Sequence, residues 1–233
     1  MTLAQIPGTP DRSLATEAKV DEALSALLTE ARLAARWAGL SQASEKAHHR
    51  ILTSFLECGD PPGIETFQAD VLGDLSRRDL VHVRNGKIAL AYPFATDQTD
   101  FSVTVAGVRV NAVCAIDALG VAAMAGRAAE VTCVCPMCQS PTKVSILQDG
   151  LTIETASKPD ARVWTGIQEV GACAADSQCK SMLLFCSSAH LEDWKRTQSA
   201  DPRGFDLSLQ QGVQLGAAIF GPFLQRHIQG ATQ

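Results

Sequence analysis

The chain has 233 residues, of which 46% are hydrophobic and 19% are charged, enough to bury the core of one large or two small domains. A net charge of −5 argues against a protein that mainly binds phosphate backbones or anionic membranes. The sequence has no run of apolar residues long enough to span a bilayer, and its polar start lacks the hydrophobic centre of a signal peptide. We therefore expect a cytoplasmic protein, in which eight cysteines favour thiol or metal chemistry over a disulfide framework.

The first part of the chain predicts helices. Residues 1–15 contain prolines and a glycine but no apolar period, which predicts a loose tail. Apolar residues recur at helical spacing over residues 20–37 and again over residues 44–57. Two short helical segments should follow, near residues 64–72 and 72–78.

A β-hairpin is predicted next, because residues 80–84 and 87–92 flank Asn85-Gly86, a pair that favours the tight type I′ turn. Helices followed by a hairpin are typical of a winged-helix module, which we assign to residues 16–95. DNA binding would be served by four basic residues there, Arg77, Arg78, Arg84 and Lys87. DNA binding is disfavoured because the helical segment that would read the groove carries acidic residues, Glu65, Asp70 and Asp74, where Lys, Arg, Asn or Gln would be expected. We therefore favour a structural module that covers a catalytic domain.

The second part of the chain, residues 96–233, predicts a catalytic domain with a mixed or antiparallel sheet and a treble-clef-like core. Its expected elements, in order, are a loop at 93–100, a hairpin at 101–110, a helix at 115–124, strands at 129–134, 143–146 and 151–154, a polar stretch at 156–178, a strand at 182–185, and helices at 187–194 and 207–228. The fold class is therefore α+β.

One thiol and one carboxylate, Cys114 and Asp117, stand three residues apart inside an apolar run at the junction of a strand and a helix. Residues at this spacing share a helix face, so both groups can reach one small ligand. A thiol at a helix start should have a lowered pKa, whereas apolar surroundings should raise the pKa of the aspartate. The alternative is that Cys114 is a small core residue and Asp117 a cap or ion-pair partner.

A second group of residues has the spacing of a zinc site. Cys135 and Cys138 form a C-x-x-C knuckle between two strands, and Cys186 and His190 lie four residues apart at the start of a later helix. Three thiolates and one imidazole could hold a structural Zn²⁺ in a treble-clef arrangement. Alternatively, Cys186 is a core residue and His190 a solvated histidine. Two spare thiols, Cys133 and Cys173, could substitute as ligands.

The order of these features over residues 48–225 resembles the organomercurial (alkylmercury) lyase family. The stretch Val113-Cys114-Ala115-Ile116-Asp117-Ala118-Leu119 is similar to that family's Trp-Cys-Ala-Leu-Asp-Thr-Leu element. Further matches are the turn at 125–129, Cys179 ahead of a buried strand, Glu192-Asp193-Trp194, and the segment 212–216. The departures are Val113 in place of an aromatic residue, and Cys138, Cys186 and His190 where better-known members carry other residues.

The resemblance implies that Cys114 and Cys179 bind the mercury of R–Hg⁺ and that Asp117 delivers a proton to carbon, giving R–H and Hg²⁺. Mercury is a soft ion that prefers thiolate ligands, which supports the same assignment. No cofactor is then required beyond a possible structural zinc. The partners would be the organomercury substrate, the Hg²⁺ product, and a mercuric reductase or small dithiol as acceptor. Membrane binding is not expected and nucleic-acid binding is disfavoured.

Two other functions remain open from the sequence. The cysteine-rich half could store, sense or transfer Zn²⁺, Cu⁺ or Hg²⁺ without lyase activity. The winged-helix half could belong to a metal-responsive regulator, against which the acidic balance argues. Detection of benzene or methane released from phenyl- or methylmercury would separate the lyase from both alternatives.

Overall fold

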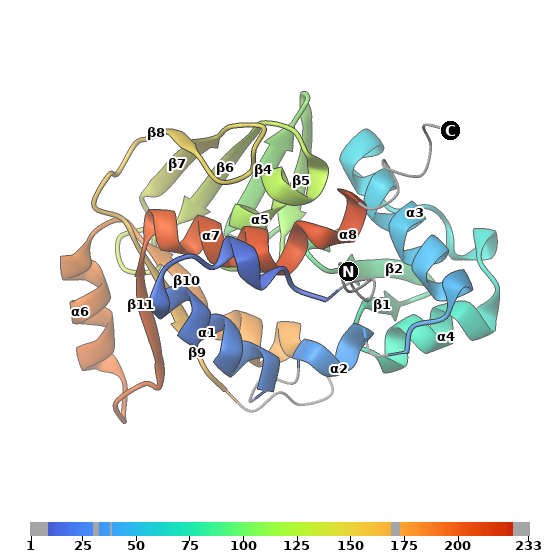
Figure 1. Ribbon diagram of the computed structural model, residues 1–233, viewed down its shortest axis with the longest axis horizontal. Helices are drawn as coiled ribbons and strands as arrows, with labels where there is room; N and C mark the ends of the chain where they lie inside the picture. Colours follow the sequence, from blue (N-terminus) through green and yellow to red (C-terminus); the bar gives the residue numbers. More distant parts are fainter. Residues whose placement is uncertain (1–8, 30–32, 38, 169–172, 226–233) are drawn as a thin grey trace.

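The computed structural model describes residues 9–29, 33–37, 39–168 and 173–225, and has the predicted α+β class with antiparallel sheets. An eight-stranded sheet has the order β1-β2-β3-β5-β4-β6-β7-β8, and a three-stranded sheet has the order β10-β9-β11 (Figure 1). The eight-stranded sheet contains strands from both predicted domains. Within the described residues, no helix has the length and apolar character needed to cross a membrane.

The helices and 3-10 turns are, in chain order, η1 (Arg12–Leu14), α1 (Ala18–Thr29), α2 (Leu33–Trp37), α3 (Gln42–Cys58), η2 (Ile64–Thr66), α4 (Ala69–Arg77), α5 (Ala115–Ala125), η3 (Ala174–Asp176), η4 (Gln178–Ser181), α6 (Ser188–Thr197), α7 (Leu209–Phe220) and α8 (Pro222–Gln225). The strands are β1 (Val81–Arg84), β2 (Lys87–Ala91), β3 (Phe94–Ala95), β4 (Phe101–Val105), β5 (Val108–Ala112), β6 (Ala129–Val134), β7 (Pro141–Ile146), β8 (Ile153–Ala156), β9 (Arg162–Gly166), β10 (Met182–Phe185) and β11 (Gly204–Ser208).

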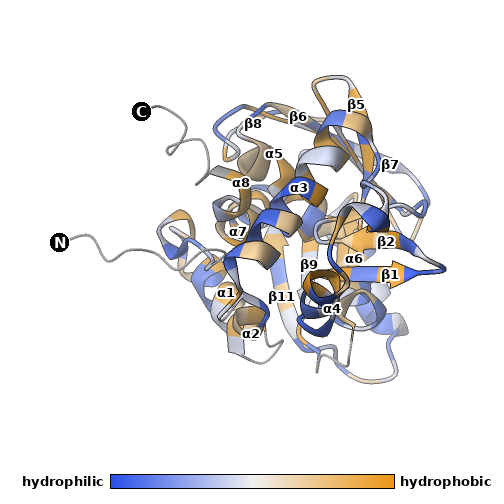
Figure 2. Cartoon of the chain, turned by 90° about the vertical axis from the view of Figure 1, so that its right-hand side faces the viewer, coloured by the Kyte–Doolittle hydropathy of each residue, from blue (hydrophilic) through white to orange (hydrophobic). Residues whose placement is uncertain are grey.

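The predicted helices and hairpin of the first half are largely present. Helix α3 begins at the cap Ser41 and ends at Gly59, which has a left-handed backbone. The β1–β2 hairpin turns at Asn85 and Gly86, both with positive φ, and its tip is hydrophilic (Figure 2). The helix expected over 20–37 is instead described as α1 and α2, and residues 30–32 lie outside the description.

The predicted tail is only partly described, since residues 1–8 lie outside the described part of the chain. Residues 9–15 include the short helix η1. The amide of Asp11 donates to the carbonyl of Ala218, 2.7 Å away, and Ala15 is buried in the core. Here a long-range contact supplies order that the local sequence does not signal.

Three strands lie where the sequence pattern indicates none. Strand β3 occupies the predicted loop at 93–100; with two residues it is too short to show alternation, and pairing with β2 and β5 defines it. Strand β9 lies inside the polar stretch 156–178 and is the middle strand of its sheet. Strand β11 includes Leu207, which was expected to start the last helix.

The last helix begins later than predicted because Ser208 caps it. The Ser208 side chain accepts from the amide of Gln211, and the Gln211 side chain accepts from the amide of Ser208. Helix α7 then ends at Phe220 and α8 follows; residues 226–228 of the predicted helix lie outside the description.

A close glycine contact packs α5 against α7 in the centre of the molecule (Figure 1). A Cβ atom at Gly120 would lie 2.6 Å from the carbonyl oxygen of Gly216, and one at Gly216 would lie 2.7 Å from the amide of Gly120. The predicted close packing of the small residues in the last helix is therefore confirmed. This contact holds α5 in the core, with Cys114 as its N-cap and Asp117 in its first turn.

Candidate active site

Helix α5 positions the first two predicted site residues. Cys114 follows β5 in an extended conformation and is the N-cap of α5, so its side chain stands over the first turn. The Cys114 sulfur accepts a hydrogen bond from the amide of Asp117 at 3.4 Å. The predicted strand-to-helix junction is thus present, and it brings the thiol and the carboxyl together.

A short turn on the other side of the site positions Cys179. This turn, η4, is held to the end of β9 because the Gln178 side chain donates to the carbonyl of Gly166 and accepts from the amide of Gln168. One ligand atom from each of Cys114, Asp117 and Cys179 lies within 4.8 Å of the others, and all three residues are buried. Met182 adds a thioether sulfur 3.4 Å from the Cys114 sulfur.

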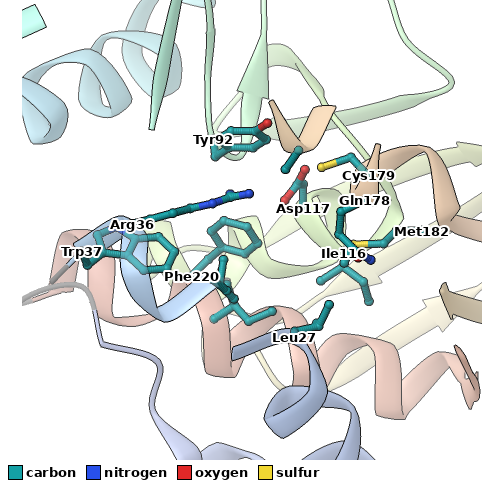
Figure 3. Close-up of a pocket in the computed structure, with 13 residues that line it drawn as sticks. Leu27, Arg36, Trp37, Tyr92, Ile116, Asp117, Gln178, Cys179, Met182 and Phe220 are labelled. Atoms are coloured by element: carbon teal, nitrogen blue, oxygen red, sulfur yellow. The ribbon is translucent and has the colours of Figure 1, made fainter. Parts of the chain in front are cut away.

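The carboxyl and the Cys179 thiol line a small cavity of about 40 Å³ (Figure 3). Its wall is mostly apolar and comes from segments far apart in the sequence, including Leu27, Trp37, Ile116, Met182, Ile219 and Phe220. One water needs roughly 10–15 Å³ of such space, so the cavity has room for a ligand of a few atoms. The site is therefore a small, mostly apolar hollow, lined by a thiol and a carboxyl.

Burial raises the pKa of Asp117 from 3.8 to about 7, although its hydrogen bond with Cys114 and the positive charge of Arg36 act in the opposite direction. The predicted direction is therefore confirmed. Its Oδ2 atom is buried and has no hydrogen-bond partner in the described part of the chain. A carboxyl with one free oxygen and a pKa of about 7 can both hold and release a proton near neutral pH, so it suits proton transfer.

The predicted lowering of the Cys114 pKa is wrong. The amide of Asp117 does point at the sulfur, as expected at a helix start, and lowers the pKa. Burial raises the pKa of Cys114 and outweighs this effect. The hydrogen bond with Cys179 and the charge of Asp117 also raise it, so the pKa of Cys114 lies well above its usual value. Cys114 is consequently a thiol at rest, and a metal must displace its proton.

A search of curated proteins found no match to this chain. The sequence profile of the family described as alkylmercury lyase (MerB) matches residues 94–221, more than half of the chain. The chain belongs to the alkylmercury lyase family. This confirms the predicted family and the predicted class of reaction, carbon–mercury bond cleavage, over the binding-protein and regulator alternatives.

The fold agrees with that of a solved structure, the crystal structure of the mercury-bound form of MerB2. That structure has a TM-score of 0.64 and 20% sequence identity to this chain, and the match covers 89% of this chain and 100% of that one. At this identity the likeness supports the fold. The individual roles of Cys114, Asp117 and Cys179 in this alkylmercury lyase stay predictions that rest on their geometry.

A charged network that the sequence pattern does not reveal lies beside the site. Arg36 on α2 is buried, and its Nη2 atom lies 2.7 Å from Oδ2 of Asp79. Figure 3 shows the Arg36 side chain between the rings of Tyr92 and Phe220, with its guanidinium directed toward Asp117; the guanidinium carbon lies 4.8 Å from the centre of the Tyr92 ring. The sequence feature that could have indicated this network is Arg36, a charged residue next to Trp37 in a mostly apolar helical segment.

Asp79 connects this network to the segment that carries Cys179. Its carboxylate pairs with Arg36 and His82 and accepts from the amide of Ala174 at 3.0 Å. The Tyr92 hydroxyl accepts from the amide of Ala175 at 2.7 Å. Burial and the nearby Cys179 raise the pKa of Tyr92, so its hydroxyl stays neutral. The network therefore fixes η3, which directly precedes η4.

The spare thiols do not join the predicted zinc group. Cys173 lies with Asp79 and His82 in a separate cluster. Cys133 is buried in the main core, where burial raises its pKa to about 12. Among the described residues, neither spare thiol is therefore grouped with Cys135, Cys138, Cys186 and His190.

The four predicted zinc residues do come together, apart from the cavity. One ligand atom from each of Cys135, Cys138, Cys186 and His190 lies within 4.8 Å of the others. Burial raises the pKa of Cys135, but amide hydrogen bonds from Cys186, Cys138 and Met137 and a hydrogen bond with His190 lower it to about 6. This alkylmercury lyase therefore contains a second sulfur-rich group, made of residues that do not line the cavity.

Proposed function

We propose that this alkylmercury lyase converts R–Hg⁺ to R–H and Hg²⁺ with Cys114 and Cys179 as mercury ligands and Asp117 as proton donor. The observation that carries the assignment is the meeting of two buried thiols and one raised-pKa carboxyl within 4.8 Å, beside the hollow that Asp117 and Cys179 line. Two sulfurs on one mercury ion increase electron density at the carbon, and a nearby acid can then protonate it.

The steps balance without an added oxidant or reductant. The Cys114 sulfur bonds to mercury and its proton passes to the Asp117 carboxylate, since a thiol bound to such a metal is deprotonated. Asp117 then gives its proton to carbon as the carbon–mercury bond breaks, and the bonding electron pair enters the new C–H bond. The Cys179 sulfur binds the same mercury ion before this step and its proton leaves to solvent, so that both sulfurs are in place when the carbon–mercury bond breaks.

The surroundings support this division of tasks. Because Cys114 is a thiol at rest and Asp117 titrates near neutrality, a proton released by sulfur has an acceptor a few ångströms away. The apolar wall formed by Trp37 and Phe220 offers a place for the organic group and excludes water. Asp117 and the two thiols supply the whole reaction in this scheme, so we propose that it requires no cofactor.

We also propose an acceptor for the Hg²⁺ product and a cellular location for the protein. Hg²⁺ held by two thiolates leaves most readily by exchange with other thiols, so a small dithiol or a mercuric reductase is the proposed acceptor. Free thiols persist in reducing compartments, which favours the cytoplasm.

We propose that the N-terminal helices and hairpin, a winged-helix-like module, act as a cover over the hollow, because Leu27 and Arg36 line it. A treble-clef-like core is proposed for the segment around β6, β7, β10 and α6.

A product assay tests the proposal. Methyl- and phenylmercury are each mixed with the protein and an excess of small thiol, and methane or benzene is measured in the gas phase. We expect hydrocarbon from the wild type and Cys58→Ser, an exposed cysteine on α3, but none above background from Cys179→Ser. Hydrocarbon release by Cys179→Ser at the wild-type rate would refute the role of the second thiol.

A further inference from the structure

The four residues of the second cluster come from two separate parts of the fold. Cys135 follows β6, and Cys138 lies in the turn before β7, both on the eight-stranded sheet. Cys186 follows β10 of the three-stranded sheet, and His190 lies in the first turn of α6, which Ser187 caps. A single ligand bound here would therefore join the two sheets.

The distances between the ligand atoms fit one small tetrahedral ion. The Cys135 sulfur lies 3.6 Å from Nδ1 of His190, the Cys138 sulfur 3.6 Å from the Cys186 sulfur, and the Cys186 sulfur 3.1 Å from Nδ1 of His190. Zinc–sulfur bonds of about 2.3 Å and zinc–nitrogen bonds of about 2.0–2.1 Å place neighbouring ligands of a tetrahedron roughly 3.6–3.8 Å apart. Small movements of side chains would thus complete the coordination.

The local packing gives the ion a structural task. The hydrophobic cluster under α6 has only four buried members among the described residues, Cys135, Trp164, Phe185 and Leu191. Leu191 is the one buried residue that α6 itself supplies. A core this small gives α6 little stabilisation, and a bound metal would add a cross-link between α6 and the β6–β7 turn.

We propose that Cys135, Cys138, Cys186 and His190 bind one structural Zn²⁺ ion. Four protein ligands close the coordination sphere, which is typical of structural rather than catalytic zinc. The ion would anchor the end of β10 that leads into α6. The other end of that strand begins at Met182, which contacts Cys114, so the zinc also stabilises the strand that borders the hollow.

Two other uses of these thiols are distinguishable from zinc binding. A disulfide between Cys138 and Cys186 would require their sulfurs to approach from 3.6 Å to about 2.05 Å and would leave Cys135 and His190 unused. Binding of the mercury product would use two thiolates and would not need the imidazole. Zinc is the ion whose preferred ligands and geometry use all four residues.

Metal analysis of the full-length protein tests the proposal. The wild type is expressed with zinc and purified under reducing conditions, and zinc per chain is measured by elemental analysis. We expect about one zinc in the wild type, in Cys58→Ser and in Cys114→Ser/Cys179→Ser, and less than about a tenth of that in Cys138→Ser/Cys186→Ser. An unchanged zinc content in Cys138→Ser/Cys186→Ser, or a zinc-free wild type, would overturn the proposal.

A second measurement needs no variant, in case Cys138→Ser/Cys186→Ser does not fold. Zinc is removed from the wild type with a chelator under reductant, and Co²⁺ is added. We expect tetrahedral ligand-field bands together with thiolate-to-cobalt charge-transfer absorption, which saturate at one equivalent and disappear when Zn²⁺ is added. Absence of these bands from the reduced protein, or a Cys138–Cys186 disulfide found by mass spectrometry despite reductant, would contradict zinc binding. Neither readout depends on hydrocarbon release.

Discussion

The carboxylate of Asp79 accepts a hydrogen bond from the amide of Ala174, although 95 positions separate the two residues in the sequence. Asp79 lies between α4 and β1, and Ala174 begins η3, which leads to Cys179. The same carboxylate forms an ion pair with Arg36, and both side chains are about nine-tenths buried. One residue thus holds α2, the hairpin and the Cys179 segment in a fixed arrangement around the hollow.

Replacing Asp79 with asparagine should lower the free energy of unfolding by about 3–5 kcal/mol, because a buried Arg36 would lose its counter-charge. Denaturant titration measures this change. In the double variant Arg36→Met/Asp79→Asn no charge is left unpaired, so stability should return in part. Equal destabilisation in the single and double variants would show that the charge pairing is not the cause.

The change Asp117→Asn should leave mercury binding by the thiols intact and reduce hydrocarbon release by at least about 100-fold, because the amide cannot donate a carboxyl proton. Gas chromatography measures the hydrocarbon, and elemental analysis measures bound mercury. The control Asp160→Asn removes an exposed carboxylate elsewhere and should behave as the wild type. Turnover at the wild-type rate in Asp117→Asn would exclude Asp117 as the proton donor.

Asp117 should also make stability depend on pH. Its folded pKa is about 7 and its reference value is 3.8, so between these values the folded state binds more protons than the unfolded state. The contribution of Asp117 to the free energy of unfolding should therefore fall, by a few kcal/mol, as pH rises from about 4 to 7. Asp117→Asn removes this contribution, so its stability relative to the wild type should increase over the same range. A difference between the two proteins that stays constant with pH would contradict the raised pKa.

Adding a methyl group at the glycine contact should destabilise the protein. Gly120→Ala places its Cβ about 2.6 Å from the Gly216 carbonyl, so α5 and α7 must separate, at a cost of about 1–3 kcal/mol or more. Thermal unfolding measures the loss. The same change at Gly73 in α4 meets only the flexible end of Arg77 and should be neutral or stabilising by up to about 1 kcal/mol. Equal effects at the two sites would argue against the packing explanation.

Short-range patterns determined much of this protein by themselves. Asn85-Gly86 specifies its hairpin, the apolar period specifies α3, and the pair Cys114 and Asp117 shares a helix start because three residues fix their separation. The C-x-x-C turn and the Cys186–His190 pair are likewise each set locally. These features depend on neighbours within about one helical turn, so the sequence alone could predict them.

The tertiary structure decided which of these local features meet. Strand β9 can be recognised only from its pairing with β10 and β11. Asp79 connects distant segments only because the fold brings Arg36 and Ala174 into contact with it. Burial of Cys114 by distant segments reversed the pKa shift that its helix start predicts. Desolvation and ion pairing depend on everything packed around a group, and residues far apart in the sequence supply most of those surroundings.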